Sequence, residues 1–373
     1  MAETEERDVR QGGPAGRRRD NRGREGARGE GRPSRDEVRE QRRREAARHT
    51  GLMKAAFGKE IEEAIEGARI YEEGEGRTLL WGAAAAEAAK AAAEAAGADA
   101  DGAVAGNEEA REEAELAEEA AEAAEGAAGG DAAPTATETV TKVVTSFAPE
   151  ALYRDGEGKT LIVDPGAFTH PGGAYEDGAF GPEQILCSES NLYPVLCAHK
   201  RDFYDKNRDY RRGSLFTDRA LYLPEVLFSR ESDTRRADVL VIAEPIRAYA
   251  LENHRSEREC DKALADRIET IFRVAAANGA EALIMGAFGC GRNGYPVEQV
   301  IELIQNWIAE HPGAVPNVVF AVPRMHADAF REAFGAPEPE RPAPVVVAED
   351  VDDREGDDED WRNVELPEGV TLR

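Results

Sequence analysis

The sequence predicts an α/β domain built on a mixed, largely parallel sheet with helices on both faces. Short aliphatic runs, such as residues 160–164 (TLIVD) and 239–243 (VLVIA), alternate with longer segments whose apolar residues recur at helical spacing. This alternation is typical of parallel sheets that are buried between two layers of helices. Two glycine-rich loops, each placed after a strand and before a helix, support the same fold class.

Length and net charge limit the possible domain organisation of the chain and the kind of ligand site that it can have. Much of the 373-residue sequence is compositionally biased, so we expect one globular domain of about 240 to 250 residues with additions. The chain has 47 Lys and Arg residues against 75 Asp and Glu residues, a net charge of −28. An acidic body repels nucleic acid and anionic membranes, so an anionic ligand has to be held by local donors.

Four cysteines are scattered along the sequence and form no CxxC pair (Cys187, Cys197, Cys260 and Cys290). No histidine stands at metal-ligand spacing, so we expect free thiols, no metal and no cofactor in a reducing, cytoplasmic setting. The sequence has no long apolar window and no apolar leader, which predicts neither secretion nor a membrane span.

The N-terminal third divides into three segments by composition. Residues 1–34 are predicted to be a disordered basic arm, since the first fifty residues hold 15 Arg against 11 acidic residues. A solvated tail and a nucleic-acid contact both remain open for this arm. Residues 35–81 show apolar spacing of three and four and predict a helical extension. Residues 82–134 are an Ala/Glu-rich low-complexity insert without an apolar stripe.

Residues 135–336 are predicted to form the main domain, followed by a disordered acidic tail at 337–373. The expected strands are 141–146, 160–164, 221–223, 239–243, 282–285 and 318–322. The expected helices are 147–152, 182–200 with a kink or end at Pro194, 261–278, 297–310 and 325–334. The charged stretch 201–213 is expected to be an exposed excursion.

The two glycine loops are the candidate ligand site. The first loop, residues 171–181, follows strand 160–164, and the second, residues 286–294, follows strand 282–285. Glycine lets backbone N–H groups approach phosphate oxygens closely, and a helix start adds further donors. Because ligands of such sheets lie beyond the carboxyl ends of the strands, we expect a phosphate-containing ligand between the loops.

Several separated segments, in this order and spacing, resemble the bacterial-type poly(ADP-ribose) glycohydrolases of the macrodomain superfamily. The segments are IVDPGAFTHPGGAYEDGAFGPEQILCSESNLYPVL, VLVIAEP, DKALADRIETIFRVAAANGAEALIMGAFGCG and VVFAVP. The resemblance covers roughly residues 135–334 and the helices between 35 and 73. It implies a macrodomain-like fold with a helical N-terminal extension and cleavage of ribose–ribose O-glycosidic bonds. The implied ligands are ADP-ribose or poly(ADP-ribose), with ADP-ribosylated proteins as a further class of partner.

The resemblance also assigns ligand-binding residues. In the family a GGG loop shapes the site around the distal ribose and diphosphate, and a GAWGCG-like loop wraps the diphosphate. Here Ala174 replaces the third glycine and Phe288 replaces the tryptophan. The positions that match these two loops are Gly172, Gly173, Gly286, Gly289, Cys290 and Gly291.

The catalytic motif departs from the family pattern. The family's QEE, whose second Glu is the catalytic acid, reads Pro182, Glu183 and Gln184 in this chain. An amide cannot transfer the proton that glycoside cleavage needs, which leaves Glu183 as the nearest replacement. Three interpretations stay open, and the first two are a hydrolase that uses Glu183 and an impaired binding module in which Gln184 holds a ribose hydroxyl. A structural or interaction protein, acting through the basic arm and the insert, is a third.

Structural roles are the alternatives to a functional role for several of these residues. Glu183 could be a solvent-facing carboxylate in the first turn of a helix. Asp164, at a strand end, could bond a ribose or cap the loop. Cys290 is interpreted as a small packing residue in preference to a reactive thiol. Arg292 could neutralise phosphate or lie on the surface, and Tyr295 is the candidate for the family's aromatic near the adenosine ribose.

Overall fold

The computed structural model describes residues 34–87, 90, 138–230 and 233–335. The predicted basic arm up to residue 33, most of the Ala/Glu-rich insert and the acidic tail lie outside these residues. None of the described helices combines the length and the apolar character that a membrane crossing requires.

A seven-stranded mixed sheet forms the centre of the main domain, in the order β1-β4-β5-β3-β6-β7-β2. Strands β5, β3, β6, β7 and β2 run parallel, whereas β4 is antiparallel to both β5 and β1. This arrangement confirms the predicted fold class. The bounds are β1 Arg69–Tyr71, β2 Val140–Val144, β3 Thr160–Asp164, β4 Ala220–Arg230, β5 Asp233–Ile242, β6 Ala282–Met285 and β7 Asn317–Ala321.

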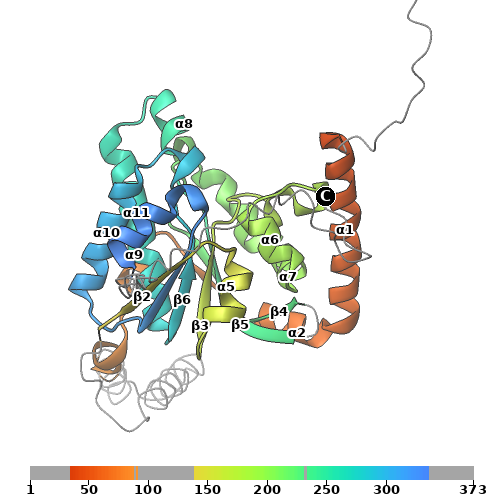
Figure 1. Ribbon diagram of the computed structural model, residues 1–373, viewed down its shortest axis with the longest axis horizontal. Coiled ribbons are helices and arrows are strands. Elements are labelled where there is room, and N and C mark those ends of the chain that lie inside the picture. Colours follow the sequence, from red (N-terminus) through yellow and green to blue (C-terminus); the bar gives the residue numbers. More distant parts are fainter. Residues whose placement is uncertain (1–33, 88–89, 91–137, 231–232, 336–373) are drawn as a thin grey trace, which may run out of the picture.

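Helices cover both faces of the sheet (Figure 1). One face carries α9 (Glu257–Ala277), α10 (Val297–Glu310) and α11 (Arg324–Phe334). The other face carries α5 (Ala148–Asp155), α6 (Pro182–Ser188), α7 (Leu192–Ala198) and α2 (Gly58–Glu66). Strand β3 is buried along its whole length because its side chains alternate between the two apolar clusters, with Leu161 and Val163 in one and Ile162 in the other. The short helix α8 (Arg247–Glu252), which follows β5, was not predicted.

The N-terminal extension is part of this packed structure. Helix α1 (Arg35–Ala56) begins at Ser34, whose side chain and that of Glu37 form a capping box. Helix α2 places Ile61 and Ala64 against β4. Strand β1, which helical spacing did not predict, pairs with β4 at the edge of the sheet.

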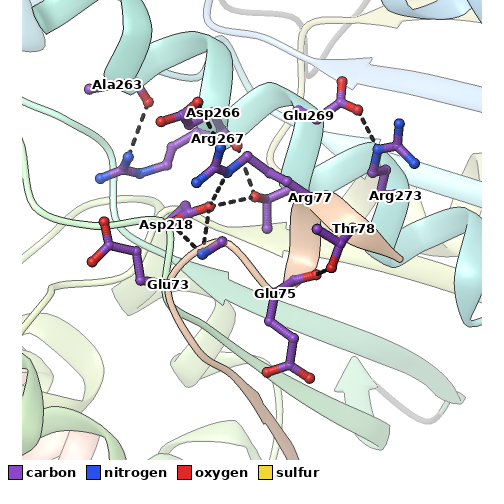
Figure 2. Close-up of polar contacts among 12 residues, drawn as sticks. Glu73, Glu75, Arg77, Thr78, Asp218, Ala263, Asp266, Arg267, Glu269 and Arg273 are labelled. Atoms are coloured by element: carbon purple, nitrogen blue, oxygen red, sulfur yellow. Dashed lines mark hydrogen bonds and ion pairs between the residues drawn. The ribbon is translucent and has the colours of Figure 1, made fainter. Parts of the chain in front are cut away.

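After β1, the segment 74–79, which we call the strap, is fastened to α9 and to the start of β4 (Figure 2). The backbone N–H of Gly74 and the Nε of Arg77 both donate to the carboxylate of Asp218, the latter at 2.6 Å. The guanidinium of Arg77 also lies 3.4 Å from Asp266 on α9. Arg273 of α9 donates to the carbonyl of Leu79. Asp218 is 2% exposed, so these donors stabilise a buried carboxylate.

The predicted helix 182–200 is wrong, because the chain there forms two helices separated at residues 189–191. Asn191 exchanges hydrogen bonds with Leu227 of β4, and the carbonyl of Glu189 accepts from Ser229. These tertiary bonds interrupt the helix ahead of Pro194. Pro194 itself sits in the first turn of α7, where a backbone N–H has no intrahelical acceptor in any case.

The predicted exposed excursion at 201–213 is also wrong in its first half. A π-helical turn at Lys200–Tyr204 buries Phe203 and Tyr204. The side chain of Asn207, also buried, donates to the carbonyl of Phe168. The charged residues of this stretch therefore indicate only that its outward face is exposed, and they do not indicate that the whole segment is.

Strands β4 and β5 are both longer than predicted, and they form an antiparallel hairpin. The pairing register shifts between Leu223 and Val226, where Glu225 adopts a φ of 53°. The bulge and Pro224 interrupt the strand pattern, so the sequence did not predict that β4 continues beyond them.

Candidate active site

Both glycine loops line one cavity of about 710 Å³ at the carboxyl ends of β2, β3, β6 and β7. The first loop contributes Phe180 and Gly181, and Pro182 at the start of α6 follows them. The second contributes residues 286–288 and 290–293. A cavity of this size at this edge of a parallel sheet is suited to a small-molecule ligand.

The first loop folds back over the start of α6, the helix that follows it. Gly172, Gly173 and Ala174 have consecutive left-handed φ values of 66°, 52° and 67°. A Cβ atom on Gly173 would lie 2.3 Å from Oε2 of Glu183, so the backbone can approach this carboxyl group only because residue 173 is glycine. These three residues do not line the cavity. They cover the side chain of Glu183 beside it.

Glu183 is buried, and the expectation of a solvent-facing carboxylate is wrong. The residue is 4% exposed, and its Oε2 accepts a hydrogen bond from the backbone of Ala167 at 2.9 Å. Its Oε1 has no hydrogen-bond partner among the described residues. The first turn of α6 is therefore oriented so that Glu183 points inward, toward the end of β3.

Asp164 lies beside Glu183 at the end of β3. It is fully buried, and neither carboxyl oxygen has a hydrogen-bond partner among the described residues, so its side chain does not cap the loop. A Cβ atom on Gly166 would lie 3.5 Å from Oε1 of Glu183 and 3.6 Å from Oδ2 of Asp164, so both groups border the same space. Burial and the neighbouring Asp164 raise the pKa of Glu183 well above its usual value. Burial and Glu244 raise the pKa of Asp164 to about 8.

Gln184 holds the glycine loop in place. Its Nε2 donates to the carbonyls of Gly172 and Gly173, at 3.0 Å and 3.1 Å. A carboxylate at this position would have only acceptors to offer to two carbonyl oxygens. The amide is therefore matched to the backbone of this loop.

Glu244 organises the second loop, and our reading of the sequence missed it. Its carboxylate accepts from the backbone N–H of Gly289 at 2.7 Å and from Nδ2 of Asn293 at 2.5 Å. Burial raises the pKa of Glu244 to about 7, although these hydrogen bonds act in the opposite direction. The sequence does contain a signal for this role, because Glu244 directly follows the aliphatic run of β5 and so lies at the carboxyl edge of the sheet.

Most other predicted residues of the second loop line the cavity: Gly286, Phe288, Cys290, Gly291 and Arg292. Burial, followed by Glu244, raises the pKa of Cys290 to about 12, so its sulfur is a protonated thiol. Gly289 lies behind the lining, with its N–H on Glu244. Tyr295 is wrong as the cavity aromatic, because its hydroxyl donates to the carbonyl of Cys260 in the core.

Aromatic and basic side chains surround the mouth of the cavity. The rings of Phe147 and Phe180 meet edge to face with centroids 6.4 Å apart, although both side chains are largely exposed. The guanidinium of Arg42 lies 4.4 Å above the ring of Phe180. Arg292 and Arg324 also line the cavity, and neither they nor Arg42 forms an ion pair within the described part of the chain. Apart from Arg292, these residues were not predicted, since they come from segments far apart in the sequence.

The described residues contain no group of three or more His, Cys, Asp or Glu side chains placed to hold a metal ion. The polar groups that the structure places at or beside the cavity are carboxyl groups, backbone donors and arginines.

The chain is similar to a known protein family in sequence and to several solved structures in fold. The sequence model of the microbial-type PARG catalytic domain matches residues 42–231, just over half of the chain, including the first loop and Glu183. A search of curated proteins gives no match.

Solved structures with a similar fold include the poly(ADP-ribose) glycohydrolase of Thermomonospora curvata. It is 22% identical, with a TM-score of 0.56 and coverage of 79% of this chain and 98% of that one. The same enzyme bound to the inhibitor ADP-HPD gives 22% identity, a TM-score of 0.55 and coverage of 78% and 99%. The glycohydrolase of Deinococcus radiodurans in complex with ADP-ribose gives 19% identity, a TM-score of 0.52 and coverage of 73% and 96%. At these identities the likeness to the solved structures concerns the fold.

Proposed function

This chain belongs to the microbial-type PARG catalytic-domain family, and we propose that it cleaves ribose–ribose bonds of ADP-ribose polymers with Glu183 as the general acid. Structures of similar fold have been solved with ADP-ribose and with the inhibitor ADP-HPD, which supports an ADP-ribose unit as the ligand of the cavity. The polymer is carried by ADP-ribosylated proteins, which would then be the partners of this chain.

The observation that carries the proposal is the state of the Glu183 carboxyl group. It is buried beneath Gly173, next to Asp164, and its Oε1 has no partner within the described residues. Burial and the neighbouring Asp164 both raise the pKa of this carboxyl group well above its usual value, which favours the protonated form. A protonated carboxyl group is what the cleavage of a glycosidic bond requires on the leaving-group side.

The proposed reaction is a hydrolysis in which Glu183 first donates a proton and later regains one. Glu183 gives its proton to the leaving ribose oxygen as the bond to the anomeric carbon breaks. Water adds to that carbon, and the proton that it loses returns to Glu183. The negatively charged diphosphate of the bound unit stabilises the positive charge that develops on the sugar ring.

The second loop and its arginines would hold the diphosphate. Gly286 and Gly291 bring the backbone close to the cavity, and Arg292 and Arg324 supply positive charge at its wall. In a chain of net charge −28, these local cations have to offset the overall field.

The test is Glu183→Gln, assayed with poly(ADP-ribose). We expect the turnover rate to fall by roughly 10² to 10⁴, the usual contribution of a general acid, while calorimetry still detects ADP-ribose binding. Glu298→Gln is the matched control, since Glu298 is an exposed glutamate in the first turn of α10, which follows the second loop as α6 follows the first. Equal rates for wild type and Glu183→Gln would refute the proposed acid.

A second candidate function is an ADP-ribose-binding module without turnover, which Gln184 in the family's acid position favours. It predicts calorimetric binding with no release of ADP-ribose, and a gain of activity in Gln184→Glu. The hydrolase proposal predicts the opposite for this variant. The new carboxyl group would face the carbonyls of Gly172 and Gly173, so the loop over Glu183 would be disturbed and activity lost.

We further propose that the protein works in a reducing, cytoplasmic setting. All four cysteines are free, and three of them are buried. Equal mobility of the cellular protein in reducing and non-reducing denaturing gels is expected, and a disulfide-linked form would contradict this setting.

A further inference from the structure

Helix α1 carries an excess of positive charge in a strongly acidic chain. It has six arginines and one lysine against four acidic residues, while the whole chain has a net charge of −28. Of these six arginines, only Arg44 forms an ion pair within the described residues, with Glu40. Within this part of the chain, no acidic side chain neutralises the charge of the other five.

Three of these arginines lie on the helix face that is turned toward the first loop. Arg35, Arg39 and Arg42 are spaced by four and three residues, and they continue the face on which Ala46 and Met53 are buried. Helix α1 runs alongside the layer that contains α6 and α7 (Figure 1), and it contacts the first loop and α7.

Two contacts connect this face to the loop. The Nε of Arg39 donates to the carbonyl of Asp177 at 2.9 Å. The guanidinium of Arg42 lies over Phe180, whose ring lines the cavity. A Cβ atom on Gly178 would lie 2.2 Å from the carbonyl oxygen of Arg39, so the loop and the helix backbone are in direct contact.

The chemistry of the polymer indicates which part of the substrate passes this helix. The bond to be cleaved joins the distal ribose of the terminal unit to the adenosine ribose of the next unit, which carries its own diphosphate. Gly173 of the first loop lies against Glu183, and α1 packs against the same loop at Gly178. Helix α1 therefore lies beside the loop that covers the proposed acid.

We propose that Arg35, Arg39 and Arg42 on α1 bind the diphosphate of the ADP-ribose unit that follows the cleaved bond, so that the protein prefers a polymer to a single unit. The inference rests on the proposed function, because it takes the terminal unit to occupy the cavity with its distal ribose at Glu183. A polyanion is the ligand that a row of arginines fits, and its repeating diphosphates supply the matching charges.

The experiment compares the affinities for ADP-ribose and for an ADP-ribose oligomer of about eight units, in a Glu183→Gln background that suppresses turnover. The test variant is Arg35→Gln/Arg42→Gln, which leaves the Arg39 bond to the loop intact. The control is Arg44→Gln/Arg48→Gln, an equal change in charge on the opposite face of the same helix. Glutamine keeps the helix propensity in both.

We expect the oligomer to bind more tightly than ADP-ribose, and the test variant to lose about threefold to tenfold of oligomer affinity with little change for the single unit. The control should keep the wild-type difference. Raising the salt concentration should weaken oligomer binding less in the test variant than in the control.

Three results would overturn the inference. One is equal oligomer affinity in the test and control variants. Another is single-stranded RNA of the same charge binding as tightly and with the same dependence on these arginines, which would make the surface a nucleic-acid site. The third is absence of ADP-ribose binding to the background protein, which would refute the proposed function as well and is separately visible in the single-unit measurement.

Discussion

Asp164 and Glu183 are the residues on which the proposed chemistry depends, and the sequence predicted only part of their environment. Neighbouring residues on a helix point about 100° apart, so the sequence could not decide whether position 183 or 184 faces the sugar. The structure turns Glu183 inward and uses Gln184 to bond the loop carbonyls. The residue types at the site were predictable, whereas their orientations depend on where α6 begins.

The buried carboxyl pair predicts an alkaline limit to activity. The acid has to be protonated, so activity should be full below the raised pKa of Glu183 and should fall as the pH rises through that pKa. Asp164→Asn removes the negative neighbour that raises the pKa of Glu183, although burial remains. We expect the alkaline limb of kcat/KM to move to lower pH.

The control for this prediction is Asp155→Asn, a buried aspartate that pairs with Lys142 and Arg154 away from the cavity. It should leave the alkaline limb where it is in the wild type. A limb that does not move in Asp164→Asn, or that moves equally in both variants, would contradict the assignment of the pair.

Ala174 is a strained position that the sequence comparison identified and the structure explains. It adopts a φ of 67°, where a Cβ atom costs roughly 1 to 2 kcal/mol. Ala174→Gly should therefore raise the free energy of unfolding by about 0.5 to 1 kcal/mol in urea titrations, after the entropy cost of glycine. Ala179→Gly, in the same loop but without a left-handed φ, should lower it. The reverse order of these two effects would show that strain at residue 174 is not significant.

At the scale of elements, the regular alternation of strand and helix was predictable, and tertiary interruptions were not. Strands β3 and β6 and helix α10 match the predicted bounds, since an apolar run or an amphipathic stripe defines each of them. The break between α6 and α7 depends on hydrogen bonds to β4, a strand more than thirty residues later. The burial of Tyr204 depends on a π-helical turn, which leaves no periodic signal.

The strap illustrates how the extension is coupled to the main domain. Arg77 offsets the charge of Asp218, which is buried beneath the strap (Figure 2). Arg77→Met should lower the free energy of unfolding by about 2 kcal/mol, because the aspartate keeps its burial and loses its main cation. Chemical denaturation would measure this loss. Arg331→Met, which removes the exposed ion pair with Asp328, should cost less than about 0.5 kcal/mol.

Equal losses in the two arginine variants would mean that the strap contributes little and that β1 and α2 alone hold the extension. The expected difference follows from burial: the Asp218 side chain is 3% exposed, whereas that of Asp328 is 98% exposed. Water compensates the exposed aspartate after its partner is removed, and it cannot reach the buried one.

At the scale of the whole molecule, the net charge of −28 acts on stability and on ligand binding in opposite directions. Like charges repel one another across an acidic body, and this repulsion disfavours the compact state. The arginines beside the cavity attract a polyanion over the same range of distances. Salt shortens that range, from about 10 Å at 0.1 M to about 3 Å at 1 M.

Sodium chloride should therefore stabilise the protein while it weakens binding of the ADP-ribose oligomer. Raising the salt from about 0.1 M to about 1 M shortens the screening length, and we expect Tm in calorimetry to rise by a few degrees. Over the same change the oligomer affinity should fall steeply, and the affinity for a single ADP-ribose should fall less, because only the oligomer reaches α1. Sucrose at equal osmolality controls for preferential exclusion, since it should raise Tm without weakening oligomer binding. A Tm that falls with salt would mean that attractive pairs, such as Arg77 with Asp218, outweigh the net repulsion.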